Sequence, residues 1–207
     1  MSRLALAGIV APLWFTALVI YQTVVQRDYN QVALPISALA AWPAGWLQNV
    51  NFVVFGVLMG AYALGLHRGV RPGRGGAISL IFLLVSAAGL VLAAVFPWGR
   101  VGGTFVVPAG HLVAAFMSFL GAALGLIAMS WRMAADPRWR SLAGYTATSG
   151  LVMVALFVAL GRLAVPDAAP LHRWAGLGQR VIVVIWFACT IVNALRLLRV
   201  ARGVEAR

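Results

Sequence analysis

The stretch LALAGIVAPLWFTALVIYQTVV, residues 4–25, decides which class of fold this chain can adopt. It contains no charged residue. As an α-helix rising about 1.5 Å per residue it would be roughly 30 Å long, which matches the hydrocarbon core of a bilayer. Arg3 precedes the stretch as in a signal peptide, but the apolar run is too long and no small-x-small cleavage pattern follows it. We therefore expect a retained membrane-spanning helix.

The composition extends this expectation to the whole chain. Of its 207 residues, 63% are hydrophobic and 10% are charged, whereas soluble domains carry about a quarter charged residues. Apolar runs like the first one recur at residues 45–66, 77–96, 108–131, 142–160 and 177–198. The sequence therefore predicts an all-α polytopic membrane protein, a bundle of six transmembrane helices that forms one domain over residues 1–207.

The net charge of +12 comes entirely from arginines at the ends of the apolar runs, with no lysine in the chain. This placement excludes an arginine-rich arm for nucleic acid and is typical of residues that orient helices and meet anionic lipid headgroups. Eleven arginines fall on one predicted side: Arg3, Arg68, Arg71, Arg74, Arg132, Arg138, Arg140, Arg196, Arg199, Arg202 and Arg207. The positive-inside rule then predicts that both termini are cytoplasmic.

The other five arginines fall on the side predicted to face outward, where positive charge is normally depleted. They are Arg27, Arg100, Arg162, Arg173 and Arg180. In one interpretation they reach the interface and pair with Asp167 or with carbonyls at helix ends. In the other they form a recess whose guanidinium groups grip a phosphate or carboxylate.

The favoured function is the binding of an anionic lipid or amphiphile at this outward-facing polar cluster, so membrane lipids are the expected partners. The predicted anion ligands are Arg100, Arg162, Arg173 and Arg180. His111 and Gln179 would add hydrogen bonds.

A first alternative is a membrane-embedded hydrolase. Ser37 would be the nucleophile, His111 or His172 the base, and Asp28 or Asp167 the group that orients the base. The sequence contains no GxSxG motif. A zinc site usually needs three protein ligands, and the outward side offers only two histidines and two aspartates, so we predict no metal site and no cofactor.

A second alternative is an accessory subunit or homo-oligomer that packs through Gly56 and Gly60 or through Gly121 and Gly125, since small-xxx-small pairs let helices approach closely. These glycines could equally serve contacts inside the bundle. The first loop is expected to place a short segment at residues 35–43 on the membrane surface, with Trp42 and Trp46 at headgroup depth.

Several short motifs carry a family resemblance. They are PISALA at residues 35–40, Asn51-Phe52 followed by Gly56, Phe96-Pro97, Gly110-His111, and GLGQR at residues 176–180. These motifs resemble the bacterial membrane proteins grouped as domain-of-unknown-function family 998, which implies six helices in a bacterial cytoplasmic membrane and supplies no activity. That family usually has an acidic residue after the serine and an aspartate after Phe-Pro. Here Ala38 and Trp98 occupy these positions, which removes acid from the outward side.

Overall fold

Six long helices confirm the predicted class of fold. The computed structural model describes residues 1–163 and 173–203, and within these ranges six helices are long and apolar enough to cross a membrane. They are α1 (Ser2–Val25), α2 (Trp46–Gly69), α3 (Gly76–Val95), α4 (Ala109–Ala135), α5 (Arg140–Leu163) and α7 (Ala175–Ala201). The last three are longer than the apolar runs alone predict, because polar and arginine residues at their ends continue the helix.

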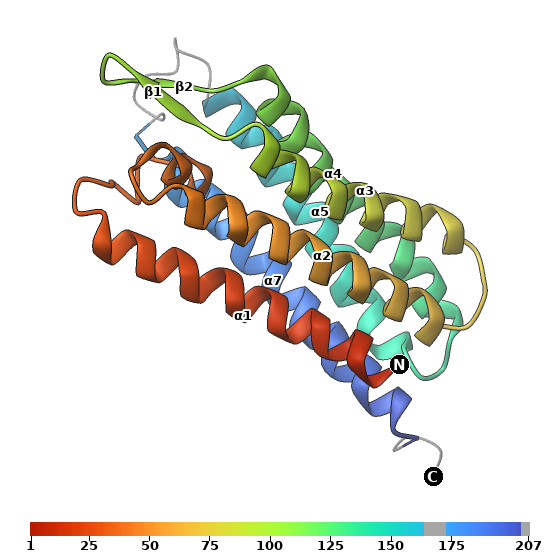
Figure 1. Ribbon diagram of the computed structural model, residues 1–207. Helices are drawn as coiled ribbons and strands as arrows, with labels where there is room; N and C mark the ends of the chain where they lie inside the picture. Colours follow the sequence, from red (N-terminus) through yellow and green to blue (C-terminus); the bar gives the residue numbers. More distant parts are fainter. Residues whose placement is uncertain (164–172, 204–207) are drawn as a thin grey trace.

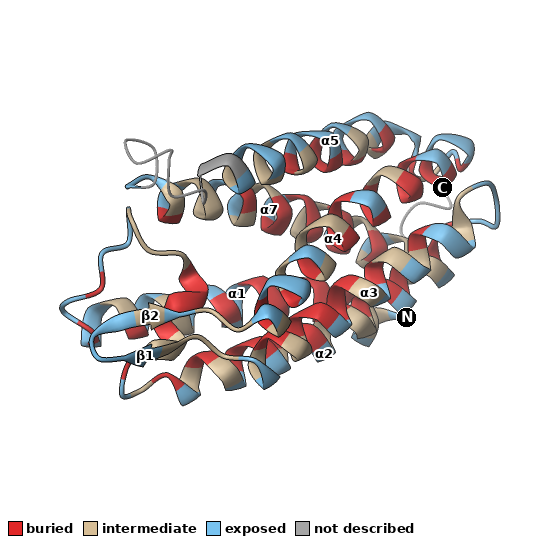
Figure 2. Cartoon of the chain, turned by 90° about the horizontal axis from the view of Figure 1, so that it is seen from above, coloured by how far each residue is buried: buried red, intermediate tan, exposed pale blue. Residues whose placement is uncertain are grey.

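The helices form a closed ring (Figure 1). Each packs on the next along the chain, from α1 through to α5, and α7 contacts both α5 and α1. Seen from above, the buried positions form stripes that face the inside of the ring, while the outer faces are exposed (Figure 2). Many of these exposed positions are large apolar side chains such as Leu13, Val57 and Phe116, as expected for surfaces that meet lipid.

The two glycine pairs serve contacts inside this ring. A Cβ at Gly56 would lie 2.8 Å from the carbonyl oxygen of Ala87, and one at Gly121 would lie 2.9 Å from that of Phe82. Gly60 and Gly125 also face α3, since a Cβ added at either would lie within 4 Å of Ala87 or Leu83 respectively. α3 therefore covers both pairs, and association with a partner or a second copy of the chain stays a prediction.

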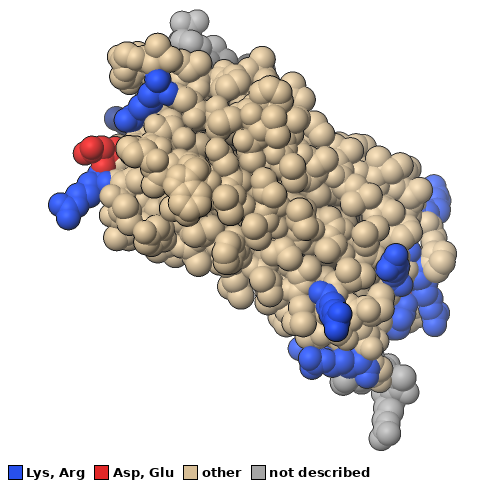
Figure 3. All heavy atoms as spheres, in the orientation of Figure 1, with Lys and Arg blue, Asp and Glu red and all other residues tan. Residues whose placement is uncertain are grey.

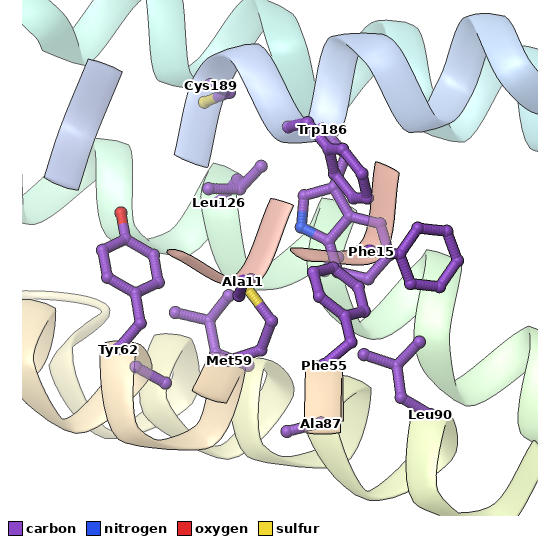
Figure 4. Packing of buried hydrophobic residues seen from close by; sticks show 14 of the residues in the cluster. Ala11, Phe15, Phe55, Met59, Tyr62, Ala87, Leu90, Leu126, Trp186 and Cys189 are labelled. Carbon is purple, nitrogen blue, oxygen red and sulfur yellow. The ribbon is translucent and has the colours of Figure 1, made fainter. Parts of the chain in front are cut away.

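An aromatic cluster fills the middle of the ring (Figure 4). The ring of Phe15 lies 4.9 Å from that of Phe55 and 5.6 Å from that of Phe187. Trp186 continues the cluster at 5.5 Å from Phe55. These side chains come from α1, α2 and α7, so the cluster joins helices that are distant in the sequence and separates the two ends of the bundle.

Charged side chains lie at the two ends, with a broad uncharged band between them (Figure 3). We call the end that carries both termini the arginine-rich end, and the opposite one the hairpin end. The uncharged band agrees with a bundle that spans a membrane. Which end faces the cytoplasm stays a prediction.

The hairpin end has a β-hairpin that the sequence pattern did not predict and a short helix within the segment expected at residues 35–43. Strands β1 (Gly99–Val101) and β2 (Thr104–Val106) pair antiparallel around Gly102 and Gly103, whose positive φ angles of 57° and 84° suit glycine. The 3₁₀-helix η1 (Ile36–Ala41) plugs the end of the ring, with Ser37 and Leu39 buried.

The expectation for the first loop is corrected in part. Trp46 is 64% exposed, as expected for an interfacial residue, but Trp42 is only 9% exposed. Trp42 packs on Tyr29 and on Phe105 of β2, because the hairpin covers it.

Candidate functional site

The arginine-rich end is closed by a buried guanidinium that caps α2. Arg132, 3% exposed, donates to the carbonyl oxygens of His67 (3.1 Å), Val70 (2.6 Å) and Arg71 (3.2 Å). It also donates to Nδ1 of His67 at 3.0 Å. Since a guanidinium can only donate, this Nδ1 accepts and a neutral His67 carries its proton on Nε2. The last carbonyls of a helix lack intrahelical donors. Arg132 donates to one of them, that of His67 in the last turn of α2, and to the two carbonyls just beyond the helix.

Asp136 completes this network. Its fully buried carboxylate accepts hydrogen bonds from the backbone of Arg71 (3.0 Å) and from Nη2 of Arg138 (2.7 Å). Burial alone would raise the pKa of Asp136, but the hydrogen bonds from Arg138 and the two backbone N–H groups outweigh it and lower the pKa to about 2. Arg132 and Arg138 therefore fasten the α2–α3 loop, which corrects the view that all arginines at this end simply meet lipid headgroups.

The hairpin end contains a cavity of about 180 Å³ at the centre of the ring. Its aromatic lining includes Phe15, Phe55, Trp186 and Phe187 of the central cluster. The polar residues on its lining are Ser37, Trp98, His111, Ser118 and Gln179. The hydroxyl of Ser118 donates to the carbonyl of Ala114 at 2.7 Å, so toward a ligand it can act only as an acceptor.

A larger groove of about 760 Å³ adjoins this cavity between α4, α5 and α7. Trp98, Ala115 and Gln179 line both spaces, so the two lie side by side. The groove is otherwise apolar, and its lining includes Phe116 and Val158, which are 56% and 58% exposed on the outer surface of the ring. The groove therefore opens sideways, toward the surface that faces lipid, and its volume is in the usual range for small-molecule sites.

His111 is fixed in one orientation. It lies in the first turn of α4, is 5% exposed, and places Nδ1 2.8 Å from the carbonyl oxygen of Phe96 at the end of α3. Because a carbonyl can only accept, Nδ1 carries a proton, and in the neutral ring Nε2 is then an acceptor. The backbone carbonyl of Phe96, rather than Asp28, orients this histidine, and Asp167 lies outside the described residues.

Gln179 and Ser37 meet at the same cavity. The backbone N–H of Ile36 donates to Oε1 of Gln179 at 2.7 Å, which satisfies a donor at the start of η1 that has no partner within its own helix. The amide nitrogen of Gln179 remains available as a donor. Ser37 follows Ile36 and lines the cavity together with His111. The structure thus brings together three of the residues that the sequence singled out.

Arg180 lies beside this cavity without lining it. Its Nη1 donates to the carbonyls of Gln31 (2.6 Å), Leu34 (3.1 Å) and Gly176 (3.0 Å), and Nη2 donates to the hydroxyl of Tyr29 (2.8 Å). Burial raises the pKa of Tyr29, and the positive charge of Arg180 opposes part of that rise. Arg180 therefore fastens the first loop to α7. Its predicted role in binding an anion stays a prediction.

The remaining predicted anion ligands are dispersed: one lies beside the groove, one is exposed away from its lining, and one has a side chain that is not described. The guanidinium of Arg100 stacks 4.1 Å from the ring of Trp42 and 4.5 Å from that of Phe105, a groove residue. Arg173 is exposed and lies 5.8 Å from the ring of Trp174. The side chain of Arg162 falls outside what the structure describes, as do the whole of His172 and Asp167. Among the described residues, no three His, Cys, Asp or Glu side chains could hold a metal ion.

Two features of this end escaped the sequence analysis. The indole nitrogen of Trp98 is buried and has no hydrogen-bond partner among the described residues. Gln22, Gln48 and Asn51 form a buried amide cluster, in which Gln48 Oε1 accepts from Gln22 at 2.9 Å and from Asn51 at 3.5 Å. The spacing of three residues between Gln48 and Asn51 places them on one helix face, which was a usable signal.

Comparison with known proteins supports the resemblance seen in the short motifs. A family described as a protein of unknown function (DUF998) matches residues 9–196, which is most of the chain. No curated protein and no solved structure matches.

Proposed function

We propose that this chain, which belongs to the DUF998 family of proteins of unknown function, binds one amphiphile from the membrane. The head group would lie in the cavity at Ser37, His111 and Gln179, and the apolar chain along the groove. The observation that carries this proposal is the lining that the two spaces share: a small cavity with polar groups adjoins a larger apolar groove that opens toward lipid.

The cavity and the groove contribute differently to binding because the surrounding solvent is lipid. A hydrocarbon chain gains little hydrophobic free energy on moving from lipid into an apolar groove, so the groove contributes mainly shape and packing. The head moves into a cavity of low polarity, where a correctly placed hydrogen bond is electrostatically stronger than in water. Selection among membrane lipids is therefore expected at Ser37, His111 and Gln179.

The location of the site is part of the proposal. The distribution of arginines supports a hairpin end that faces away from the cytoplasm of a bacterial cell, in its cytoplasmic membrane. Single cysteines at the exposed positions Thr104 and Arg74, in a Cys189→Ala background, test this with a membrane-impermeant thiol reagent on intact cells. Labelling at residue 104 alone is the expected result, and labelling at residue 74 alone would reverse the orientation.

The binding proposal is tested by filling the junction of the two spaces. Ala115 lines both, so Ala115→Phe is expected to exclude a lipid that mass spectrometry detects on the purified wild-type protein. Leu124→Phe is the matched control, since Leu124 is 37% exposed on the same helix and lines neither space. A wild-type protein that retains no lipid, or equal retention in both variants, would count against the proposal.

A second candidate function is hydrolysis of an ester within the same cavity. The observation that favours it is the orientation of His111, whose Nδ1–H is held by the carbonyl of Phe96 while Ser37 lines the same space. Turnover of a panel of lipid esters by the purified protein, abolished in a folded Ser37→Ala variant, is the result that this candidate requires. Absence of turnover across the panel removes it.

A further inference from the structure

We infer that the bound amphiphile has an uncharged head that carries both a hydroxyl group and an ester or carbonyl oxygen, as in a monoacylglycerol. This inference rests on the proposed function and names the class of ligand that the site would take. It departs from the expectation of an anionic head, and three observations carry it.

The first observation concerns charge. Among the described residues, no charged side chain lines the cavity or the groove. The nearest candidate, Arg180, already donates to three carbonyls and to the hydroxyl of Tyr29. An anion that enters such a cavity loses its hydration without gaining a cationic partner, which is costly. Arg100 stacks on rings at the rim and is exposed, so a charge could meet it there but not inside.

The second observation is the indole of Trp98. Its Nε1–H is buried, has no partner among the described residues, and belongs to a side chain that lines both spaces. An indole nitrogen can only donate. Buried donors nearly always have an acceptor in native proteins, and this one lies where the head of a ligand would meet the groove. An ester or carbonyl oxygen at the junction of head and chain supplies that acceptor.

The third observation is that the cavity wall offers both a hydrogen-bond acceptor and hydrogen-bond donors. His111 presents an acceptor at Nε2, because Nδ1 donates to the carbonyl of Phe96. Gln179 presents donors, because its oxygen is occupied by the N–H of Ile36. A ligand hydroxyl satisfies both, since it donates to His111 and accepts from Gln179. A phosphodiester anion has no hydroxyl to donate to His111, and a quaternary ammonium group can neither donate nor accept.

The experiment compares two photoactivatable probes that share one chain length and differ in the head. One is a monoacylglycerol and the other is an alkyl phosphate methylated on the phosphate, so that its anionic head carries no hydroxyl. We expect the monoacylglycerol to label peptides of α4 and α5 at least tenfold more efficiently in purified wild-type protein. Preferential labelling by the alkyl phosphate would overturn this inference and leave the proposed function standing. Labelling of the groove by neither probe would overturn both.

Two variants test the named contacts. Trp98→Phe keeps an aromatic ring and removes the N–H, and His111→Asn keeps an amide donor for the carbonyl of Phe96 while removing the acceptor at the position of Nε2. Each is expected to lower monoacylglycerol labelling about tenfold, the loss of one good hydrogen bond, and to leave the alkyl phosphate unchanged. Trp46→Phe, at a tryptophan 64% exposed, is the matched control. Unchanged labelling in both variants would overturn the inference, and thermal unfolding shows that each variant is folded.

Discussion

Replacing Arg180 with alanine tests whether its guanidinium holds the first loop in place or binds a ligand. In the structure, the guanidinium directs its donors to the carbonyls of Gln31, Leu34 and Gly176 and to the hydroxyl of Tyr29. We therefore expect the Arg180→Ala variant to be destabilised even when no lipid is bound. A residue that serves only to bind an anion would change lipid retention and leave the stability of the lipid-free protein unchanged.

The size of the effect follows from these contacts. Hydrogen bonds from a charged donor contribute about 1.5–3 kcal/mol each. The carbonyl of Gln31 is exposed and regains water when the side chain is removed, whereas the carbonyls of Leu34 and Gly176 are partly buried. Because contributions that share one side chain are not additive, we expect a total loss of about 2–4 kcal/mol. For a chain of this size this corresponds to a fall in Tm of roughly 4–16 °C.

The chain contains its own reporter for this measurement. Cys189 is the single cysteine and is fully buried in α7, so a thiol-reactive fluorogenic dye labels it only when the bundle opens. Arg173→Ala is the matched control, because Arg173 is exposed at the same end and contacts only the ring of Trp174 in the described part of the chain. Its Tm is expected to stay at the wild-type value.

A double-mutant cycle with Tyr29→Phe sharpens the test. Arg180 and the Tyr29 hydroxyl lie 2.8 Å apart, and groups in direct contact typically couple by about 0.5–3 kcal/mol. We expect a coupling free energy of about 1 kcal/mol. An unchanged Tm in delipidated Arg180→Ala, together with zero coupling to Tyr29→Phe, would refute the interpretation of Arg180 as a loop fastener.

Three further predictions concern the rest of the bundle. Asp136→Asn is expected to lower Tm at pH 5. The pKa of Asp136 in the folded chain, about 2, lies below its ordinary value of 3.8, so its carboxylate stabilises the fold above pH 4 and this stabilisation is lost as the pH falls through 2. The Tm difference from wild type should therefore shrink between pH 5 and pH 2. Gly56→Leu is expected to lower the free energy of unfolding by about 1–3 kcal/mol in the same dye assay, because its Cβ would lie 2.8 Å from a backbone oxygen. Gly60→Ala is expected to be tolerated, because the nearest contact of its Cβ lies at 3.6 Å. The reverse order of stability would contradict the packing described for α2 and α3. Gln48→Leu is expected to lower the free energy of unfolding by about 1–3 kcal/mol, because it leaves the amides of Gln22 and Asn51 without a shared acceptor. Changing Gln22, Gln48 and Asn51 together to leucine should recover part of that loss. A triple variant less stable than Gln48→Leu would argue against a shared acceptor.

The hydrophobic pattern was sufficient to predict the six spans. In lipid every backbone polar group must be paired within the segment, so an uncharged run of membrane length has essentially one available conformation, the helix. The ends of the spans were less predictable. Arg132 and Arg138 look like arginines that face headgroups, but they turn inward, because the carbonyls of α2 and the carboxylate of Asp136 provide partners that only the folded bundle brings near.

The candidate site was predictable in its residue types and not in its assembly. Ser37, His111 and Gln179 stood out because polar side chains near helix ends are few in so apolar a chain. The sequence offered no measure of which neighbours Arg180 would meet, since its partners in the first loop lie about 150 residues away along the chain. Trp98 was missed because a tryptophan at a helix end is ordinarily interpreted as an interface anchor until its N–H is seen to lack a partner.

The closed ring also sets an order of events during biosynthesis. Of the six described long helices, α1 is synthesised before the others, whereas α7, one of its neighbours, is synthesised after them. The guanidinium of Arg180 can bind the hydroxyl of Tyr29 only after 151 further residues have been synthesised. A nascent chain arrested before residue 175 should therefore keep its first loop open to protease, and release of the last helix should close it. Maturation of the hairpin end is then a late, all-at-once step that follows the insertion of every helix.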